Sequence, residues 1–219
     1  INVKDKLIKV IPVGIDVNKV IKTACEKIDS DAISYIIELK NKGYNILVAP
    51  IRLSREKGIM DLVIAIKLLA SRLKNHDIKF KLVLFGGTLE KAIKQIVKKF
   101  SLEDYVYIVV SRKRKDALKI LKYADIVVNT TSLPGAGMVN LEALALKKIV
   151  IRASAPWTYP IINNVTGIIY RSGIPSDLAR NIYKLLTNEQ IFDRAINCAQ
   201  YGYEIVNREF NINLIANRY

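Results

Sequence analysis

Residues 80–110, FKLVLFGGTLEKAIKQIVKKFSLEDYVYIVV, decide the fold of this 219-residue chain. The runs Phe80–Phe85 and Tyr105–Val110 are apolar through most of their length and have the length of strands. Between them, Leu89–Phe100 places its apolar residues at helical spacing and its lysines on the opposite face. Because continuously apolar runs are typical of parallel strands covered on both faces, this stretch predicts a strand–helix–strand unit.

The same alternation extends along most of the chain. Residues 17–43 predict two helices, of which the second begins after Ser30 and ends at Gly43. Glu189–Tyr219 is largely helical in pattern, with a break near Asn207. The other predicted strands are Leu7–Ile11, Ile46–Ala49, Asp125–Asn129, Ile149–Ile151 and Gly167–Tyr170, and the other helices are Lys57–Leu73, Lys115–Tyr123, Val139–Leu146 and Ser176–Leu186. The predicted fold class is α/β, with a doubly wound, Rossmann-like parallel sheet.

The charge of the chain indicates what kind of partner it has. There are 35 Lys and Arg residues against 20 Asp and Glu, a net charge of +15, which favours a polyanion such as nucleotide phosphates, nucleic acid or an anionic membrane surface. The two cysteines are too few for a disulfide scaffold, and one histidine argues against a histidine metal site or a Ser-His-Asp triad. No apolar run approaches the roughly 20 residues of a membrane span, and we expect a cytoplasmic protein.

Ligands of open α/β sheets bind beyond the carboxyl ends of the strands, so the loops at those ends are the candidate sites. The loop that follows Ile46–Ala49 carries Arg52 and Lys57, which could bind phosphate oxygens, although a solvated polar loop would have the same composition. Gly86 and Gly87 follow the next strand and would let the backbone approach a ligand; a tight turn would use them equally well.

Residues 129–142, NTTSLPGAGMVNLE, form the richest of these loops. Gly135 and Gly137 would leave backbone N–H groups free to face an anion at a helix N-terminus. Glu142 could accept two ribose hydroxyls, or could simply satisfy the helix dipole. Asn140 stands where a dinucleotide fingerprint needs its third glycine, so an NAD site is not expected. The cations of the basic run Ser111–Asp116 could meet a phosphate or nucleic acid, but the run is interpreted as a surface loop of a very basic protein.

Seven short segments also follow one another in a characteristic order. They are Val10–Asp16 (VIPVGID), Ile51–Gly58 (IRLSREKG), Leu82–Gly87 (LVLFGG), Tyr123–Val128 (YADIVV), Gly135–Ala145 (GAGMVNLEALA), Asn164–Gly167 (NVTG) and Phe210–Tyr219 (FNINLIANRY). Together they resemble the C-terminal, donor-binding half of the retaining GT-B glycosyltransferases, the glycogen-synthase-like group that includes bacterial mannosyl- and glucosyltransferases.

The resemblance implies a hexosyltransferase-like enzyme whose substrate is a nucleoside-diphosphate sugar and which needs neither a cofactor nor a metal. It implies that Arg52 and Lys57 are the catalytic cations that bind the diphosphate, and that Glu142 holds the ribose. The other donor-binding positions that it implies are Gly86, Gly87, Gly135, Ala136, Gly137, Met138 and Val139. Sugar transfer would retain the anomeric configuration by displacement on one face, with the leaving phosphate helping to deprotonate the acceptor.

The resemblance also implies partners. Residues 1–16 resemble the segment that leaves an N-terminal acceptor-binding domain or subunit, residues 17–206 would form the donor domain, and residues 207–219 the C-terminal helix. The chain would then be one half of a GT-B fold. The acceptor would be a glycan or a lipid, and the positive charge would suit peripheral docking to an anionic membrane surface.

One departure from the family pattern keeps an alternative function open. The family spaces two glutamates as E-x7-E, and Pro134 replaces the first of them, which normally contacts the donor sugar. A non-catalytic module that binds sugar nucleotides or a partner through the same fold is therefore the alternative. A nucleic-acid-binding protein would rest on the charge alone, since stacking aromatics are missing from the basic run, and no nucleic acid partner is expected.

Overall fold

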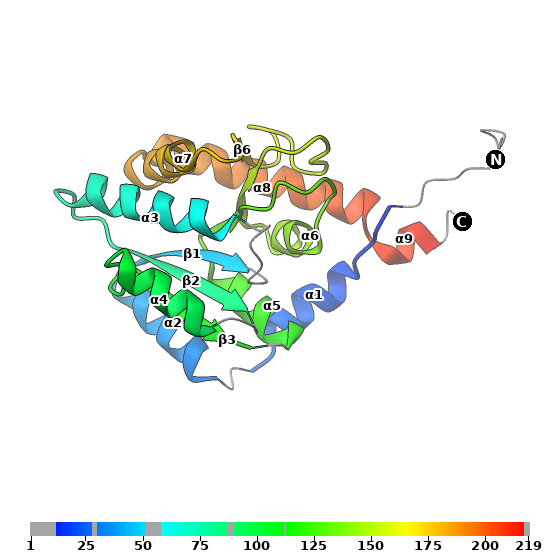
Figure 1. Ribbon diagram of the computed structural model, residues 1–219. Coiled ribbons are helices and arrows are strands. Elements are labelled where there is room, and N and C mark those ends of the chain that lie inside the picture. Colours follow the sequence, from blue (N-terminus) through cyan, green and yellow to red (C-terminus); the bar gives the residue numbers. More distant parts are fainter. Residues whose placement is uncertain (1–11, 28–29, 51–57, 87–89, 112, 217–219) are drawn as a thin grey trace, which may run out of the picture.

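The computed structural model describes residues 12–27, 30–50, 58–86, 90–111 and 113–216. Within them, six strands form one sheet in the order β3-β2-β1-β4-β5-β6, and every neighbouring pair is parallel (Figure 1). This order is that of a doubly wound, Rossmann-like sheet. The α/β class and the parallel sheet predicted from the apolar runs are confirmed.

The strands lie close to their predicted positions. Leu7–Ile11 lies outside the described residues, and the predicted strand Ile149–Ile151 continues for two further residues. The strands are β1 (Asn45–Pro50), β2 (Phe80–Gly86), β3 (Val106–Val110), β4 (Ile126–Asn129), β5 (Ile149–Ala153) and β6 (Ile168–Tyr170).

The helices also follow the predicted pattern, with one difference near the C-terminus. Gly43 has a φ of 80° and ends α2, as its position in the sequence suggests. The helical break lies at Phe210 and Asn211 rather than near Asn207. The helices are α1 (Val17–Cys25), α2 (Asp31–Asn41), α3 (Ile59–Leu73), α4 (Glu90–Lys99), α5 (Arg114–Tyr123), α6 (Met138–Ala145), α7 (Pro175–Thr187), α8 (Glu189–Glu209) and α9 (Ile212–Ala216).

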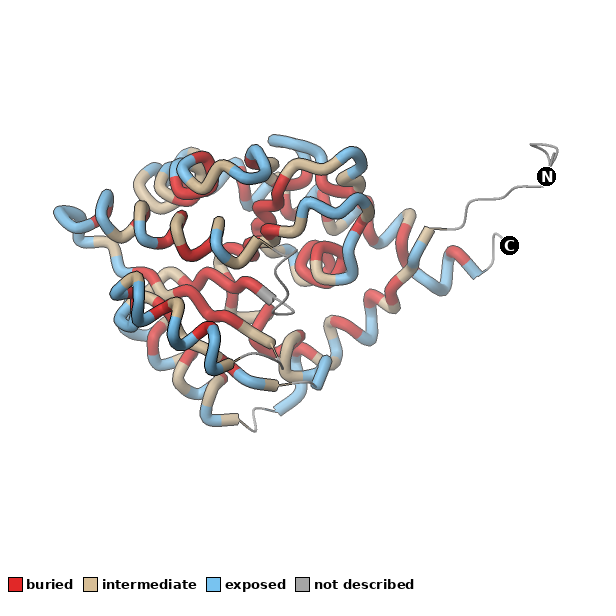
Figure 2. Tube along the Cα trace, in the orientation of Figure 1, coloured by how far each residue is buried: buried red, intermediate tan, exposed pale blue. Residues whose placement is uncertain are grey.

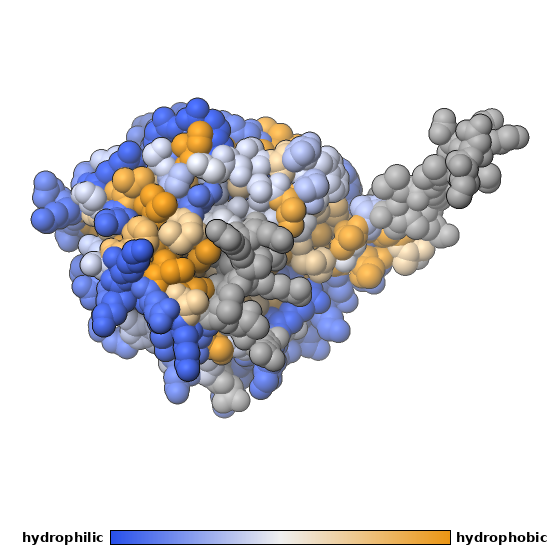
Figure 3. Space-filling view, in the orientation of Figure 1, coloured by the Kyte–Doolittle hydropathy of each residue, from blue (hydrophilic) through white to orange (hydrophobic). Residues whose placement is uncertain are grey.

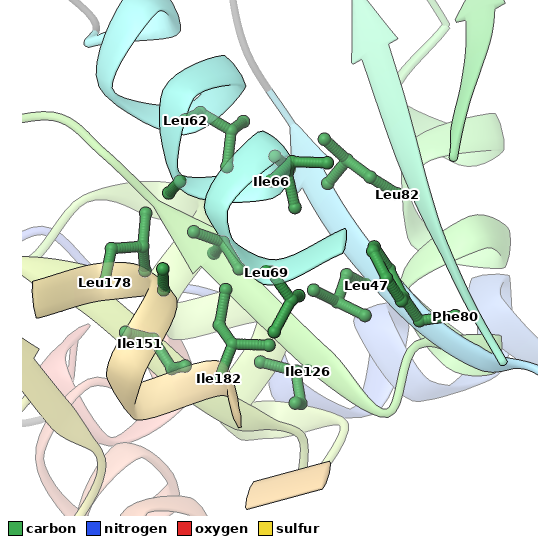
Figure 4. Close-up of a cluster of buried hydrophobic side chains, with 14 of the residues drawn as sticks. Leu47, Leu62, Ile66, Leu69, Phe80, Leu82, Ile126, Ile151, Leu178 and Ile182 are labelled. Carbon is green, nitrogen blue, oxygen red and sulfur yellow. The ribbon is translucent and has the colours of Figure 1, made fainter. Parts of the chain in front are cut away.

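Helices cover both faces of the sheet and bury alternate residues of each strand. On one face, side chains of α3 and α7 such as Leu69 and Ile182 pack on Leu47 and Ile126 (Figure 4). On the other face, α1, α2, α5 and α6 pack on residues such as Val127. The central strands β4 and β5 and the inner faces of the helices are therefore largely buried (Figure 2). Only the strand ends are left for polar groups that need to meet a ligand.

The sheet reverses its direction of winding between β1 and β4. The chain leaves β1 through α3 toward β2 and β3, and returns through α5, on the opposite face, to β4. The switch point therefore lies between the carboxyl ends of β1 and β4. In folds of this class, such a switch point is where ligands bind.

Gly58 holds the start of α3 against the end of β4. It has a φ of 64°, and a Cβ atom placed on it would lie 2.7 Å from the carbonyl oxygen of Thr130. Glycine is required here both for its conformation and because the two backbones lie so close together. This contact fixes the distance between the two elements that flank the switch point.

The segment before α1 lies beside α9. The N–H of Ile15 donates to the carbonyl oxygen of Phe210 (2.8 Å), and the N–H of Ile212 donates to that of Ile15 (2.9 Å). Figure 1 shows the two segments together, away from the sheet. The division at residues 16 and 206 stays a prediction, although α8 runs continuously past the second of these positions.

The visible face of the molecule carries both hydrophilic and hydrophobic areas. Figure 3 shows hydrophilic residues over much of the visible face, among them those of the lysine-rich helix α4 at the lower left. In the described parts of the chain, no helix combines the length and the apolar composition that crossing a membrane requires.

Gly58→Ala should destabilise the protein more than Gly43→Ala does. Both glycines have positive φ, but a Cβ atom on Gly43 would meet nothing within 4 Å. Gly43→Ala should therefore cost only the left-handed conformation, about 1–2 kcal/mol. Gly58→Ala should lose about 1–3 kcal/mol more, because the backbone of Thr130 has to move. Urea denaturation of both variants measures the difference, and equal losses would show that the close approach is not tight.

Candidate functional site

The loop between β4 and α6, residues 130–137, lies at the switch point of the sheet. Gly135 has a φ of 122° and Gly137 a φ of 68°, which are conformations that side chains with a Cβ rarely adopt. Gly137 is also the residue immediately before α6. The two glycines let the loop turn sharply into the helix.

Successive carbonyl groups of this loop are bound by the protein itself. The carbonyl oxygen of Ala136 accepts a hydrogen bond from Nδ2 of Asn140 (2.8 Å). That of Gly137 accepts from the backbone N–H groups of Asn140 (3.0 Å) and Leu141 (3.2 Å). Asn140 is fully buried, and its Oδ1 accepts from Nδ2 of Asn129 (3.0 Å). Asn140 is therefore a structural support of the loop and does not face a ligand.

The N–H groups of the loop have the opposite orientation. In a trans peptide the N–H points away from the preceding carbonyl, and the one cis bond of the described chain lies elsewhere. None of the described residues accepts a hydrogen bond from four consecutive N–H groups, those of Ala136, Gly137, Met138 and Val139. We call these four groups the amide array. At the N-terminus of α6, whose dipole is positive there, the amide array can bind an anion.

Glu142 lies one turn into α6, next to the amide array. The residue is 5% exposed, and its Oε1 accepts a hydrogen bond from Nε of Arg114 at 2.7 Å. Burial raises the pKa of the Glu142 carboxyl, and the hydrogen bond and charge of Arg114 oppose this rise. A buried carboxylate beside an anion site can accept hydrogen bonds from hydroxyl groups of the same ligand.

Arg114 corrects one interpretation of the sequence. The basic run Ser111–Asp116 was expected to be a surface loop, but Arg114 opens α5 and its guanidinium reaches Glu142 of α6. Its position four residues after the end of β3, at the carboxyl edge of the sheet, was the signal that could have identified it. Arg114 itself is largely exposed, so that part of the guanidinium can meet a ligand.

The structure brings together six of the predicted site residues and separates one. Gly86 ends β2, at the same edge of the sheet but two strands away from β4. Arg52, Lys57 and Gly87 lie outside the described residues. The six that lie together in one loop and helix start are Gly135, Ala136, Gly137, Met138, Val139 and Glu142. Across the described ranges, no cluster of three or more His, Cys, Asp or Glu residues could hold a metal ion.

Arg152, in β5, is a residue that the sequence analysis did not identify. It is 1% exposed, and its guanidinium binds the 130–137 loop from the side of the sheet. Nη1 donates to the carbonyl oxygens of Gly135 (2.8 Å) and Thr158 (3.4 Å), and Nη2 to that of Leu133 (3.2 Å). An arginine directly after the apolar run Ile149–Ile151 was the available signal.

Arg114→Ala should lower the free energy of unfolding by about 1–3 kcal/mol at neutral pH, because it leaves a buried carboxylate without its charged partner. Removal of Arg114 should also raise the pKa of Glu142 further above its ordinary value of 4.5. Between pH 4.5 and the raised pKa, the folded state binds a proton that the unfolded chain has released. Stability therefore falls as the pH rises through this range. The loss should be complete above the raised pKa and should shrink as the pH falls through that pKa toward the ordinary value of 4.5.

Urea denaturation over a pH series measures this effect. Lys115→Ala, which removes the exposed neighbouring cation, is the matched control and should leave stability nearly unchanged at every pH. An Arg114→Ala loss that is the same at acid and neutral pH would contradict a role in stabilising the Glu142 carboxylate.

Comparison with known proteins places this geometry in a family. Residues 34–205 match the family model "Glycosyl transferases group 1". No curated protein sequence matches the chain. A glycosyltransferase from Rickettsia africae ESF-5 superposes with a TM-score of 0.75 at 21% identity, over 99% of this chain and 56% of that one. Anabaena HepE, solved with UDP and glucose, gives 0.76 at 22% identity, over 98% and 56%.

A further similar structure is a C-terminal domain. That of LpcC, a glycosyl transferase group 1 family protein from Francisella tularensis, has a TM-score of 0.68 at 19% identity and is matched over 100% of its length, against 91% of this chain. The chain thus spans 56% of the first two structures and the whole of an isolated C-terminal domain. With the family model matching from α2 to α8, the chain belongs to the glycosyl transferases group 1 family.

Proposed function

We propose that the chain binds a nucleoside-diphosphate sugar and is the donor-binding half of a glycosyltransferase. The amide array carries this proposal: it offers four consecutive N–H groups to an anion, at a helix N-terminus and at the switch point of the sheet. Glu142 lies beside it and suits the ribose hydroxyls of the same ligand. A diphosphate joined to a ribose satisfies both features at once.

Charge development explains how such a site would assist sugar transfer. When the bond between the sugar and the diphosphate breaks, the leaving diphosphate gains negative charge. Fixed N–H groups and cations stabilise that charge without having to reorganise. In the proposed enzyme the amide array does this together with Arg52 and Lys57, which follow β1 in the sequence.

The proposed transfer is retaining and independent of metal. The acceptor oxygen forms its bond to the anomeric carbon on the face from which the diphosphate departs. The acceptor proton passes to an oxygen of the leaving phosphate, so that no protein base is needed. Backbone N–H groups and cationic side chains would neutralise the diphosphate, the task that a metal performs in other transferases.

The acceptor and the cellular setting complete the proposal. The acceptor is a glycan or a lipid, presented by an N-terminal domain or subunit across the donor site. The net charge of +15 supports peripheral association with an anionic membrane on the cytoplasmic side. HepE was solved with UDP and with UDP-glucose, so UDP is the first nucleotide to test.

Pro134 favours a second candidate function. Proline offers a donor sugar neither a carboxylate nor an N–H group. A chain that binds the nucleotide but lacks this contact could serve as a non-catalytic sugar-nucleotide-binding module. Assays of sugar transfer and of nucleotide binding, carried out separately, distinguish the two functions.

A nucleoside diphosphate should raise the stability of the chain. A ligand that binds only the folded state adds about 2.7 kcal/mol when its concentration is a hundred times its Kd. Thermal melts with UDP, GDP and ADP at low salt should show an increase in Tm for at least one of them, and a much smaller one for the matching nucleoside. No shift with any of the three at millimolar concentration would refute the proposed donor site.

The same melts distinguish a phosphate site from general stabilisation. Arg52→Ala should diminish the shift caused by the diphosphate, whereas Arg194→Ala, an exposed arginine of α8, should not. If both variants reduce the shift equally, the ligand responds to the overall charge of the protein and not to the site.

The chain should discriminate weakly between a sugar nucleotide and its bare nucleoside diphosphate. The missing contact of the sugar with a carboxylate at position 134 would be worth about 1.5–3 kcal/mol. Calorimetric titrations with both ligands measure the difference, and Pro134→Glu should increase affinity for the sugar nucleotide alone. Sugar nucleotide binding that is already about tenfold tighter in the parent would mean that another residue holds the sugar.

A further inference from the structure

Arg152 is a buried cation whose partners are all neutral. Its guanidinium donates to the carbonyl oxygens of Leu133, Gly135 and Thr158, and Nε donates to that of Ala153 (3.2 Å). None of the ion pairs among the described residues involves it. Burial lowers its pKa, yet a guanidinium stays charged in proteins. The site therefore contains a desolvated positive charge directly beneath the loop.

The hydrogen bonds of Arg152 determine where the amide array begins. By drawing the carbonyl of Gly135 inward, the guanidinium turns the N–H of Ala136 to the opposite side of the same peptide. The preceding positions supply no such donor, because Pro134 has no N–H and that of Gly135 donates to the carbonyl oxygen of Trp157 (3.0 Å). The N–H of Ala136 is thus the first of the array, and Arg152 sets its direction.

The other peptides of the array are held by α6 itself, through Asn140 and the first turn of the helix. The peptide between Gly135 and Ala136 is the exception, because its carbonyl is bound from β5, a separate strand of the sheet. Arg152 thereby couples the sheet to the part of the loop that precedes the helix. In its absence, the first N–H of the array would lose its fixed orientation.

We propose that Arg152 is a positioning residue for the donor diphosphate, an inference that rests on the proposed function. It holds the peptide between Gly135 and Ala136 so that the Ala136 N–H faces the phosphate oxygens. Its buried charge, poorly screened by solvent, also adds to the attraction of the dianionic group from beneath the loop. Ribose binding at Glu142 does not depend on it.

The test compares Arg152→Lys and Arg152→Met with the parent chain, and uses Arg194→Lys as the control for an exposed arginine. Calorimetric titrations with UDP, GDP and ADP, with the nucleoside of whichever binds, and with inorganic pyrophosphate give the affinities. For Arg152→Lys, which keeps the charge but not the planar fork, we expect affinity for the diphosphate and for pyrophosphate to fall about tenfold. Affinity for the nucleoside should stay within about twofold of the parent.

Each outcome decides between distinct conclusions. If Arg152→Lys keeps the parent's ratio of nucleoside to diphosphate affinity, whether both are unchanged or both fall together, the positioning role is wrong while the donor site stands. If the parent binds none of the three diphosphates and no pyrophosphate, the proposed function fails and this inference fails with it. Arg152→Met should lose more diphosphate affinity than Arg152→Lys, since it removes the charge as well.

Nuclear magnetic resonance of the parent chain decides the matter if neither variant folds. During a pyrophosphate titration, the Ala136 amide and the Arg152 Nε–H signals should shift with the same midpoint. A signal from either group that does not respond would overturn the proposal.

Discussion

Burial of the central strands on both faces is the constraint on which the rest of this molecule depends. Leu47, Val48, Val127 and Val128 are at most 1% exposed, so these strands have no room for chemistry along their length. Parallel pairing brings all the carboxyl ends to one edge, and the reversal of winding lies between β1 and β4 at that edge. The loop after β4, the start of α6 and Glu142 all take their positions from this edge. The site is a consequence of how the sheet is covered.

Much of this arrangement could be predicted from the sequence because it depends on local patterns. Continuous apolar runs identified the strands, and helical spacing identified the helices between them. Gly135, Gly137 and Glu142 were found because glycines after a strand and a carboxylate in the next helix lie within a few residues of each other. The ligand-binding roles of all these residues stay predictions, and Arg52 and Lys57 also fall outside the described residues.

The two arginines of the site could not be predicted in the same way, because their partners are distant in the sequence. Arg114 pairs with a residue 28 positions away, and Arg152 binds a carbonyl 17 positions away. Only the folded sheet brings these groups together. Arg152 also follows the predicted strand Ile149–Ile151 directly. At the end of a buried strand, the residue pattern favours a small or apolar side chain. Its charge is tolerated there because the loop folds its carbonyl oxygens around the guanidinium.

Two kinds of positive charge coexist in the protein and respond differently to solvent. The lysines of α4 and much of the net charge of +15 lie on the surface, where salt screens them within about 10 Å. The N–H groups at the start of α6 are fixed dipoles, and Arg152 is a desolvated charge. Salt therefore screens their interactions less than it screens those of the exposed lysines. The surface charge suits a long-range attraction to polyanions, and the charge of the site suits a specific contact.

The hydrogen bonds between Arg152 and the loop also limit how this sequence can be changed. Leu133, Gly135 and Thr158 belong to segments on either side of β5, yet they share a single donor group. A loop transplanted from another protein of this fold would arrive without carbonyl oxygens shaped to an arginine, and would leave a charge buried without partners. A transplanted strand with a short side chain at this position would need ordered water to donate hydrogen bonds to the carbonyl oxygens of the loop. Replacement of Arg152 should therefore be accepted, in evolution or in design, only together with a change in the backbone path of the loop.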